Sequence, residues 1–210
     1  MSRSKRTIPH FSLSQTLDVD PAVRFLEERN AGAHPQERII LGALFVRATA
    51  LACAKVPVMN GHFDEAQGFL PSKPVNPGVA IALRGGGLVA PALTDAARMS
   101  LPEVMAGMRD LTTRARAGRL RASEMTGGTI TVSSLGETGS ETMTGVIFPP
   151  QVALVGLGAP HLRPWVVEGA VVPRRVVTLT VSADHRVSDG RQVARFIAEM
   201  ATLIERPEEL

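Results

Sequence analysis

The sequence predicts an α+β fold, a mixed β-sheet sandwich with helices packed on it. Segments with the period-2 pattern of strands and segments with the 3.6-residue period of amphipathic helices are interspersed along the 210 residues without a strict βαβ order. A chain of this length buries roughly 70% of the surface that its unfolded form exposes, so it needs no disulfide or structural metal to fold. Because no repeat, low-complexity tract or linker interrupts the sequence, we expect residues 1–210 to form one domain.

Alternation of apolar and polar residues marks the expected strands. Over residues 11–19, Phe11, Leu13 and Leu17 fall on one side and serine and threonine residues on the other, which predicts a strand with one solvated face. Further strands are expected at residues 78–83, 87–92, 129–133, 152–157 and 176–182. The triple glycine at residues 85–87 lacks the spacing of a dinucleotide-binding fingerprint and is interpreted as a tight turn. Residues 60–77, rich in proline and glycine, are expected to form a loop.

Four helices are expected from their capping residues and apolar periodicity. They cover residues 20–30, 37–56, about 100–118 and 191–205. Asp20 is expected to supply a side-chain acceptor at the start of the first helix. Ser100 and Glu103 form a capping box ahead of the third, whose methionines are expected to fill the core. The last helix carries a continuous apolar face, which predicts that it packs against the sheet.

The composition argues against several classes of function. Cys53 is the only cysteine, which excludes an internal disulfide or a multi-cysteine zinc site. The pI of about 9.7 comes from an excess of arginine, and without tyrosine or a run of aromatic residues we predict no nucleic-acid partner. The most apolar stretch, residues 39–56, is interrupted by Arg47 and Lys55, and no apolar signal segment follows the basic start. We therefore expect no membrane association and a reducing compartment, the bacterial cytoplasm.

The densest polar cluster is DHRVSDG, residues 184–190, which lies between a predicted strand and the last helix. His185 is flanked there by several ionisable residues, and an imidazole of pKa about 6.5 is suited to remove the proton of a thiol of pKa about 8.5. Asp189 has a second interpretation, because an aspartate followed three residues later by Gln192 is also a helix cap. From the spacing alone, both a catalytic role for the His185–Asp189 pair and a capping role for Asp189 stay open.

Six further blocks accompany this motif along the chain: SKRTIPHFSLSQTLDVD, GVAIALRGGGLVAPAL, SLPEVMAGMRDLTTRARAGRL, TGGTITVSSLG, PPQVALVGLG and ARFIAEMATLIERP. Together with DHRVSDG they resemble, in the same order, the catalytic domain of the dihydrolipoamide acyltransferases. These proteins form the core component of 2-oxo acid dehydrogenase complexes and have the fold of chloramphenicol acetyltransferase. The resemblance covers nearly the whole chain, and it implies this chloramphenicol acetyltransferase-like fold here.

The resemblance implies a role for three residues. His185 would be the general base, Asp189 would help to orient the site, and Ser133 would donate a hydrogen bond to the oxyanion. The implied reaction moves an acyl group between a dihydrolipoyl thioester and coenzyme A, which is a substrate, without a metal. The residues that contact coenzyme A stay unassigned. Without the resemblance, Ser133 beside Ser134 is equally a polar position at the edge of a sheet.

The remaining histidines are expected to lie outside the chemistry. His10 is expected to be structural or to line a channel, whereas His34, His62 and His161 are expected to be solvated in loops. Cys53 lies within the apolar helix, so the reacting thiols should come from coenzyme A and lipoamide.

The resemblance also implies a homotrimer or a multiple of trimers, in which the histidine of one subunit meets the serine of its neighbour. Family members usually carry a further helix, a peripheral-subunit-binding domain and lipoyl domains ahead of this domain. This sequence holds no lysine-bearing lipoyl hairpin, so we expect another domain or chain to supply the lipoyl group. The expected partners are a lipoyl-domain protein and 2-oxo acid dehydrogenase subunits.

Two alternatives and one departure from the family accompany this interpretation. The chain could be a non-catalytic core or scaffold subunit that assembles with a full-length acyltransferase, or a coenzyme A-dependent acyltransferase that acts on a small amine or alcohol. The departure is GETGSETMTGVIF, residues 136–148, which lacks the aromatic residue usual after SSLG in the family. This difference is expected to alter the acyl pocket or the trimer contact.

Overall fold

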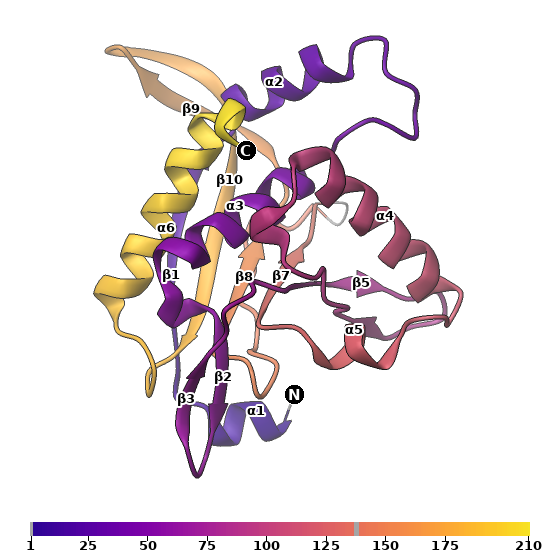
Figure 1. The fold of residues 1–210 in the computed structure, drawn as a ribbon. Helices are drawn as coiled ribbons and strands as arrows, with labels where there is room; N and C mark the ends of the chain where they lie inside the picture. The colour runs from indigo at the N-terminus through magenta and orange to yellow at the C-terminus, as the bar shows by residue number, and fades with distance from the viewer. Residues whose placement is uncertain (1, 137–138) are drawn as a thin grey trace.

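The centre of the molecule is a six-stranded mixed sheet with the order β1-β10-β8-β7-β4, in which β9 pairs with the first part of β10. The structure is a computed structural model that describes residues 2–136 and 139–210 (Figure 1). Its strands are β1 (His10–Asp18), β4 (Pro77–Val79), β7 (Ile130–Ser134), β8 (Ala153–Leu157), β9 (His161–Val167) and β10 (Ala170–Asp184). The pairs β4–β7 and β7–β8 are parallel and the other pairs antiparallel, which confirms the predicted mixed sheet.

Helices cover one face of this sheet. Figure 1 shows α3 and α6 side by side against it, with α4 beside them and α2 reaching outward from one end. The helices are α1 (Ser2–Thr7), α2 (Asp20–Asn30), α3 (Leu41–Lys55), α4 (Leu101–Arg116), α5 (Ala122–Thr126) and α6 (Gly190–Glu205), with short 3₁₀ turns at Pro57–Met59, Ala96–Arg98 and Pro207–Glu209. The core helix α3 is buried around most of its circumference, which explains its nearly continuous apolar sequence.

The two faces of the sheet differ in chemistry. Along β10, Val177, Leu179 and Val181 belong to the main core beneath the helices. The alternate residues Thr180 and Ser182 are also buried but face the other way, because successive side chains of a strand point to opposite faces. We call this second side, which also carries threonines and serines of β1 and β7, the hydroxyl face. A separate small apolar cluster covers part of it.

Residues 60–77 are not a loop, as the sequence analysis expected, but contain an antiparallel hairpin of β2 (Gly61–Asp64) and β3 (Gly68–Pro71). The carboxylate of Asp64 accepts the backbone N–H groups of Ala66 and Gln67 and so closes the turn. Two four-residue strands bounded by glycine and proline carry too little alternation to be recognised as strands. The expected tight turn at residues 85–87 is confirmed, between β5 (Ile81–Ala82) and β6 (Leu88–Val89).

Several smaller expectations were wrong. Asp20 does not cap α2, because the helix begins at Asp20 itself and its carboxylate accepts the backbone N–H of Arg175 at 3.2 Å. The core helix begins at Leu41 rather than at residue 37. The sequence analysis also missed α1, α5 and β9, and it began β10 six residues too late. The capping box of Ser100 and Glu103 and the burial of the α4 methionines are confirmed.

Candidate active site

His185 lies immediately after β10, on an exposed turn. Its backbone N–H donates to the carbonyl of Pro9 at 3.1 Å, which ties the turn to the residue before β1. The ring of Phe11 lies 4.6 Å from the imidazole, at an interplanar angle of 49°. Among the described residues, none hydrogen-bonds to the imidazole nitrogens. The ring is therefore held by a tilted aromatic contact and keeps a nitrogen available to accept a proton.

An ion pair between a buried carboxylate and a partly exposed arginine fixes the turn that carries His185. Asp184 is fully buried, and its carboxylate accepts the guanidinium of Arg186 at 2.7 and 3.0 Å and the backbone N–H of Arg186. These hydrogen bonds raise the pKa of Arg186. Because Asp184 and Arg186 flank His185, their pairing restricts the backbone on both sides of it. The sequence analysis treated these residues only as ionisable neighbours of the histidine.

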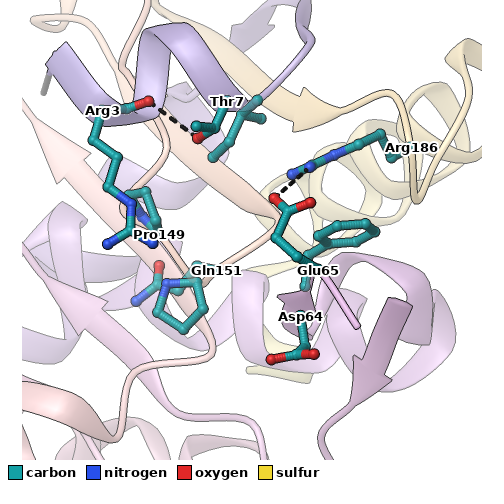
Figure 2. A pocket seen from close by; sticks show the side chains of 10 residues that line it. Arg3, Thr7, Asp64, Glu65, Pro149, Gln151 and Arg186 are labelled. Atoms are coloured by element: carbon teal, nitrogen blue, oxygen red, sulfur yellow. Dashed lines mark hydrogen bonds and ion pairs between the residues drawn. The ribbon is translucent and has the colours of Figure 1, made fainter. Parts of the chain in front are cut away.

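Arg186 also connects this turn to the β2–β3 hairpin. Its guanidinium lies 3.8 Å above the ring of Phe63 and 3.1 Å from the carboxylate of Glu65. These residues line a cavity of about 280 Å³, and Figure 2 shows Arg186 reaching Glu65 on one side of it while Arg3 extends from α1 toward Pro149 on the other. His185 is not among the residues that line this cavity, although Arg186 of the same turn is.

Asp189 caps α6. Its carboxylate accepts the backbone N–H of Gln192 at 2.9 Å, and the Gln192 side chain accepts the backbone N–H of Asp189 at 2.9 Å. The capping interpretation of this pair is therefore confirmed. The contacts of Asp189 act on the start of the helix, four residues beyond His185, and through it on the turn between them.

Ser133 lies near the end of β7, between β4 and β8 in the strand order, and is only 9% exposed. The interpretation of Ser133 as a polar residue at a sheet edge is therefore wrong. The residue opposite it on β8 is Gly156, which has no side chain, and Thr180 and Met143 occupy the space that a Cβ there would take. Ser134, by contrast, is exposed, and its hydroxyl accepts the backbone N–H of Gly136.

The sheet register separates the two candidate groups within one chain. Ser133 is opposite Gly156, Gly156 is opposite Thr180, and His185 is five residues beyond Thr180. With a rise of about 3.3 Å per residue and about 4.8 Å between strands, their backbones lie roughly 19 Å apart. A single reacting carbonyl needs both groups at about 3 Å. If both residues act on one carbonyl, a single chain does not bring them together. We call the surroundings of His185 the histidine half-site and those of Ser133 the serine half-site.

The other histidines have structural contacts. His10 donates from Nδ1 to the Ile8 carbonyl at 2.9 Å and accepts the Ile147 N–H at Nε2 at 3.1 Å, which agrees with the expected structural role. His62 in β2 donates to the Gly128 carbonyl at 2.8 Å, and His161 is half-buried in β9, so the expectation of solvated loops was wrong for both. His34 is exposed in a loop, as expected.

Cys53 is buried in α3, and burial raises the pKa of its thiol, which fits a structural cysteine rather than a nucleophile. Among the described residues, no three histidine, cysteine or carboxylate side chains are grouped to hold a metal ion. No described helix has the length and apolar character needed to span a bilayer. Residues 137 and 138 of the segment that departs from the family lie outside the described part of the chain.

A family model described as 2-oxoacid dehydrogenases acyltransferase (catalytic domain) matches residues 1–210. The chain belongs to this family. The acyltransferase domain is 35% identical over 208 residues to the dihydrolipoyllysine-residue acetyltransferase component of the pyruvate dehydrogenase complex of Zymomonas mobilis, covering 99% of this chain and 47% of the relative. It is also 35% identical to the lipoamide acyltransferase component of the branched-chain alpha-keto acid dehydrogenase complex of Pseudomonas aeruginosa, with coverages of 99% and 49%. The chain thus spans about half the length of these relatives.

Solved structures agree with this assignment. The acyltransferase domain superposes with a TM-score of 0.92 on the dihydrolipoamide acetyltransferase of Azotobacter vinelandii, at 28% identity and covering 99% of this chain and 86% of that one. The cubic core of a pyruvate dehydrogenase multienzyme complex gives the same TM-score at 27% identity, with the same coverages. Chloramphenicol acetyltransferase matches at 14% identity, 95% and 91% coverage and a TM-score of 0.63, which confirms the predicted fold.

Proposed function

We propose that this chain is an acyltransferase that exchanges an acyl group between a dihydrolipoyl thioester and coenzyme A. The observation that carries the proposal is a spacing. The work on the Azotobacter vinelandii structure concerns a serine, a histidine and an asparagine in the catalytic mechanism, where the histidine is 52 positions after the serine and the asparagine four positions after the histidine. His185 is likewise 52 positions after Ser133, and Asp189 is four positions after His185. The alignment with that protein covers 99% of this chain.

In the proposed mechanism, His185 removes the proton from the thiol of coenzyme A or of dihydrolipoamide. The thiolate attacks the acyl carbonyl of the other thioester, and the hydroxyl of Ser133 donates a hydrogen bond to the tetrahedral oxyanion. Collapse of this intermediate breaks the original carbon–sulfur bond, and the departing thiolate takes the proton back from the imidazolium. His185 is exposed, and no hydrogen bond to its ring nitrogens is seen from residues 2–136 or 139–210, which supports the role of base. Asp189 orients the turn by capping α6.

We further propose that the active site forms between subunits of a homotrimer or of a larger assembly of trimers. The separation of roughly 19 Å between the half-sites supports this, because the two groups meet only if a neighbour brings its serine half-site to the histidine. The match to a cubic core also supports it, since cubic symmetry places three subunits around each corner. In this proposal the lipoyl group comes from another domain or chain, the partners are 2-oxo acid dehydrogenase subunits, and the reaction occurs in the bacterial cytoplasm.

The chain is 35% identical to an acetyltransferase, 35% identical to the acyltransferase component of a branched-chain alpha-keto acid dehydrogenase complex and 36% identical to a succinyltransferase. Because these identities are so close, the proposal names the reaction class rather than one acyl group. The test is acyl transfer from acyl-coenzyme A to free dihydrolipoamide by the purified protein. We expect His185→Ala to lower kcat by about 10²- to 10⁴-fold. The matched control is His34→Ala, which removes an exposed loop imidazole and should leave kcat unchanged.

The outcomes of this assay separate the alternatives. Wild-type protein that forms intact oligomers but transfers no more than His185→Ala would contradict the enzyme and favour a scaffold. Release of coenzyme A with a small amine or alcohol, but not with dihydrolipoamide, would replace the proposed acceptor.

A further inference from the structure

The chain after the serine half-site lies flat against the hydroxyl face of the sheet. We call residues 141–148 the strap. The hydroxyl of Thr180 donates to the carbonyl of Met143, and the hydroxyl of Ser182 donates to the carbonyl of Gly145 at 2.8 Å. Both the donors and the acceptors are two residues apart in sequence. This shared period shows that the strap runs alongside β10, with side-chain hydroxyls taking the place of a neighbouring strand.

The opposite side of the strap contacts β8 in a matching register. A Cβ added at Gly158 would collide with the carbonyl of Glu141, a backbone contact that side-chain motion does not relieve. One at Gly156 would lie 2.6 Å from the hydroxyl of Thr180 and 3.0 Å from both the carbonyl and the side chain of Met143. The glycines of the VGLG sequence therefore let the strap approach the sheet closely, a requirement that no sequence pattern revealed.

The far end of the strap is fixed at Ile147. Its carbonyl accepts the hydroxyl of the buried Ser4 at 2.6 Å, and its N–H donates to His10 at 3.1 Å. The Ile147 side chain is buried with Ile8 and Leu154. The strap is thus held by hydroxyls in its middle and by polar and apolar contacts at its end.

The strap lies next to the serine half-site. Gly156 is the residue opposite Ser133 on β8, and the side chain of Met143 occupies the space above it, 3.0 Å from where a Cβ would be. The position of Met143 is set by the hydrogen bond from Thr180. We propose that the strap forms the wall beside the Ser133 hydroxyl, and that Thr180 and Ser182 are positioning residues that hold this wall against the sheet. The catalytic part of this inference rests on the proposed function.

The experiment compares two identical changes on one strand. Thr180→Val removes the hydroxyl that binds Met143, and Thr178→Val makes the same change two residues earlier on the same face, where the structure shows no hydrogen bond from the hydroxyl among the described residues. We expect Thr180→Val to lower kcat about tenfold or more with a smaller change in KM, because small misplacement of a reacting group is costly. Thr180→Ser should restore kcat, and Thr178→Val should leave it unchanged.

A purely structural role would lower the thermal midpoint of Thr180→Val without changing the kcat of its folded fraction. That result, or equal losses in Thr180→Val and Thr180→Ser, would overturn the inference. If Thr180→Val fails to fold, Ser182→Ala applies the same test with the loss of a single oxygen atom.

Hydrogen exchange at residues 141–148 gives a readout that does not depend on activity. We expect faster exchange there in Thr180→Val than in Thr178→Val. Equal exchange would overturn the anchoring. Inactive wild-type protein would refute the proposed function and the catalytic part of this inference, while hydrogen exchange would still decide whether the hydroxyls anchor the strap.

Discussion

The two half-sites of the chain are built in opposite ways. His185 is exposed on a turn at the end of β10, where the Phe11 ring and the pair of Asp184 and Arg186 hold it. Ser133 is nearly buried within the sheet, between paired strands and beside the strap. The proposed base is thus placed by a few specific contacts around one turn, whereas the proposed oxyanion donor is placed by the sheet itself.

This difference has a consequence for mutations. Changes near His185 can disturb its turn while the core stays folded, whereas the geometry at Ser133 depends on the register of three neighbouring strands. Function at the histidine half-site should therefore be separable from stability by single substitutions that leave the pair of Asp184 and Arg186 intact. At the serine half-site the two should be separable by removal of the Ser133 hydroxyl or of the hydroxyls that hold the strap beside it.

At the serine half-site, the largest expected effect comes from the Ser133 hydroxyl. Ser133→Ala should lower kcat by about 10²- to 10³-fold, because it removes one hydrogen-bond donor to the oxyanion. KM and the unfolding midpoint should change little, since only one oxygen atom is lost. Steady-state kinetics checks this, with Ser134→Ala as the same change at the exposed neighbouring position. Equal kinetics for the two variants would remove Ser133 from the mechanism.

Breaking the ion pair beside His185 should mainly cost stability. Arg186→Met leaves the carboxylate of Asp184 buried without its partner, and we expect a loss of about 3 kcal/mol in the free energy of unfolding. Urea denaturation measures it. Glu65→Gln removes only the exposed partner of the same arginine and should cost less than about 0.5 kcal/mol. Similar losses in both variants would contradict the importance of the buried pair.

The cap of α6 should contribute less. Asp189→Ala removes the acceptor for the Gln192 N–H and should lower the free energy of unfolding by about 1 kcal/mol. Asp189→Asn keeps a capping oxygen and should stay within a few tenths of a kcal/mol of wild type. Chemical denaturation of the two variants, with kcat measured in parallel, separates capping from a direct catalytic charge. A large loss of kcat in a stable Asp189→Asn variant would show that the charge acts in the chemistry.

The smallest effect concerns α5, which precedes β7 and its serine. Hydrogen bonds from Arg114, and then from the backbone of Arg121, lower the pKa of Glu124 to about 2. An unfolded chain has a glutamate pKa of about 4.3, so this stabilisation is complete above that pH and is lost as the pH falls toward 2. The stability difference between wild type and Glu124→Gln should therefore shrink between pH 4 and pH 2 in urea titrations. A difference independent of pH would contradict the pairing.

The sequence predicted the long elements and the family but not the tertiary contacts around the candidate site. Periodicity located β1, α4 and α6, and the resemblance singled out His185 and Ser133. The β2–β3 hairpin was missed because each strand has only four residues. Phe11, Phe63 and Thr180 gave no signal, because their roles come from partners more than 35 residues away in sequence. Only the register of the sheet revealed the distance between the half-sites.

The central claim is that the site forms only between subunits, and mixed oligomers test it most directly. His185→Ala subunits keep an intact serine half-site, and Ser133→Ala subunits keep an intact histidine half-site. Equal amounts of the two inactive variants, assembled together by co-expression, should regain about one quarter of wild-type kcat. Each site then receives an intact histidine and an intact serine with a probability of one half each. Recovery near this level supports the account, whereas activity no higher than that of either variant alone would contradict it.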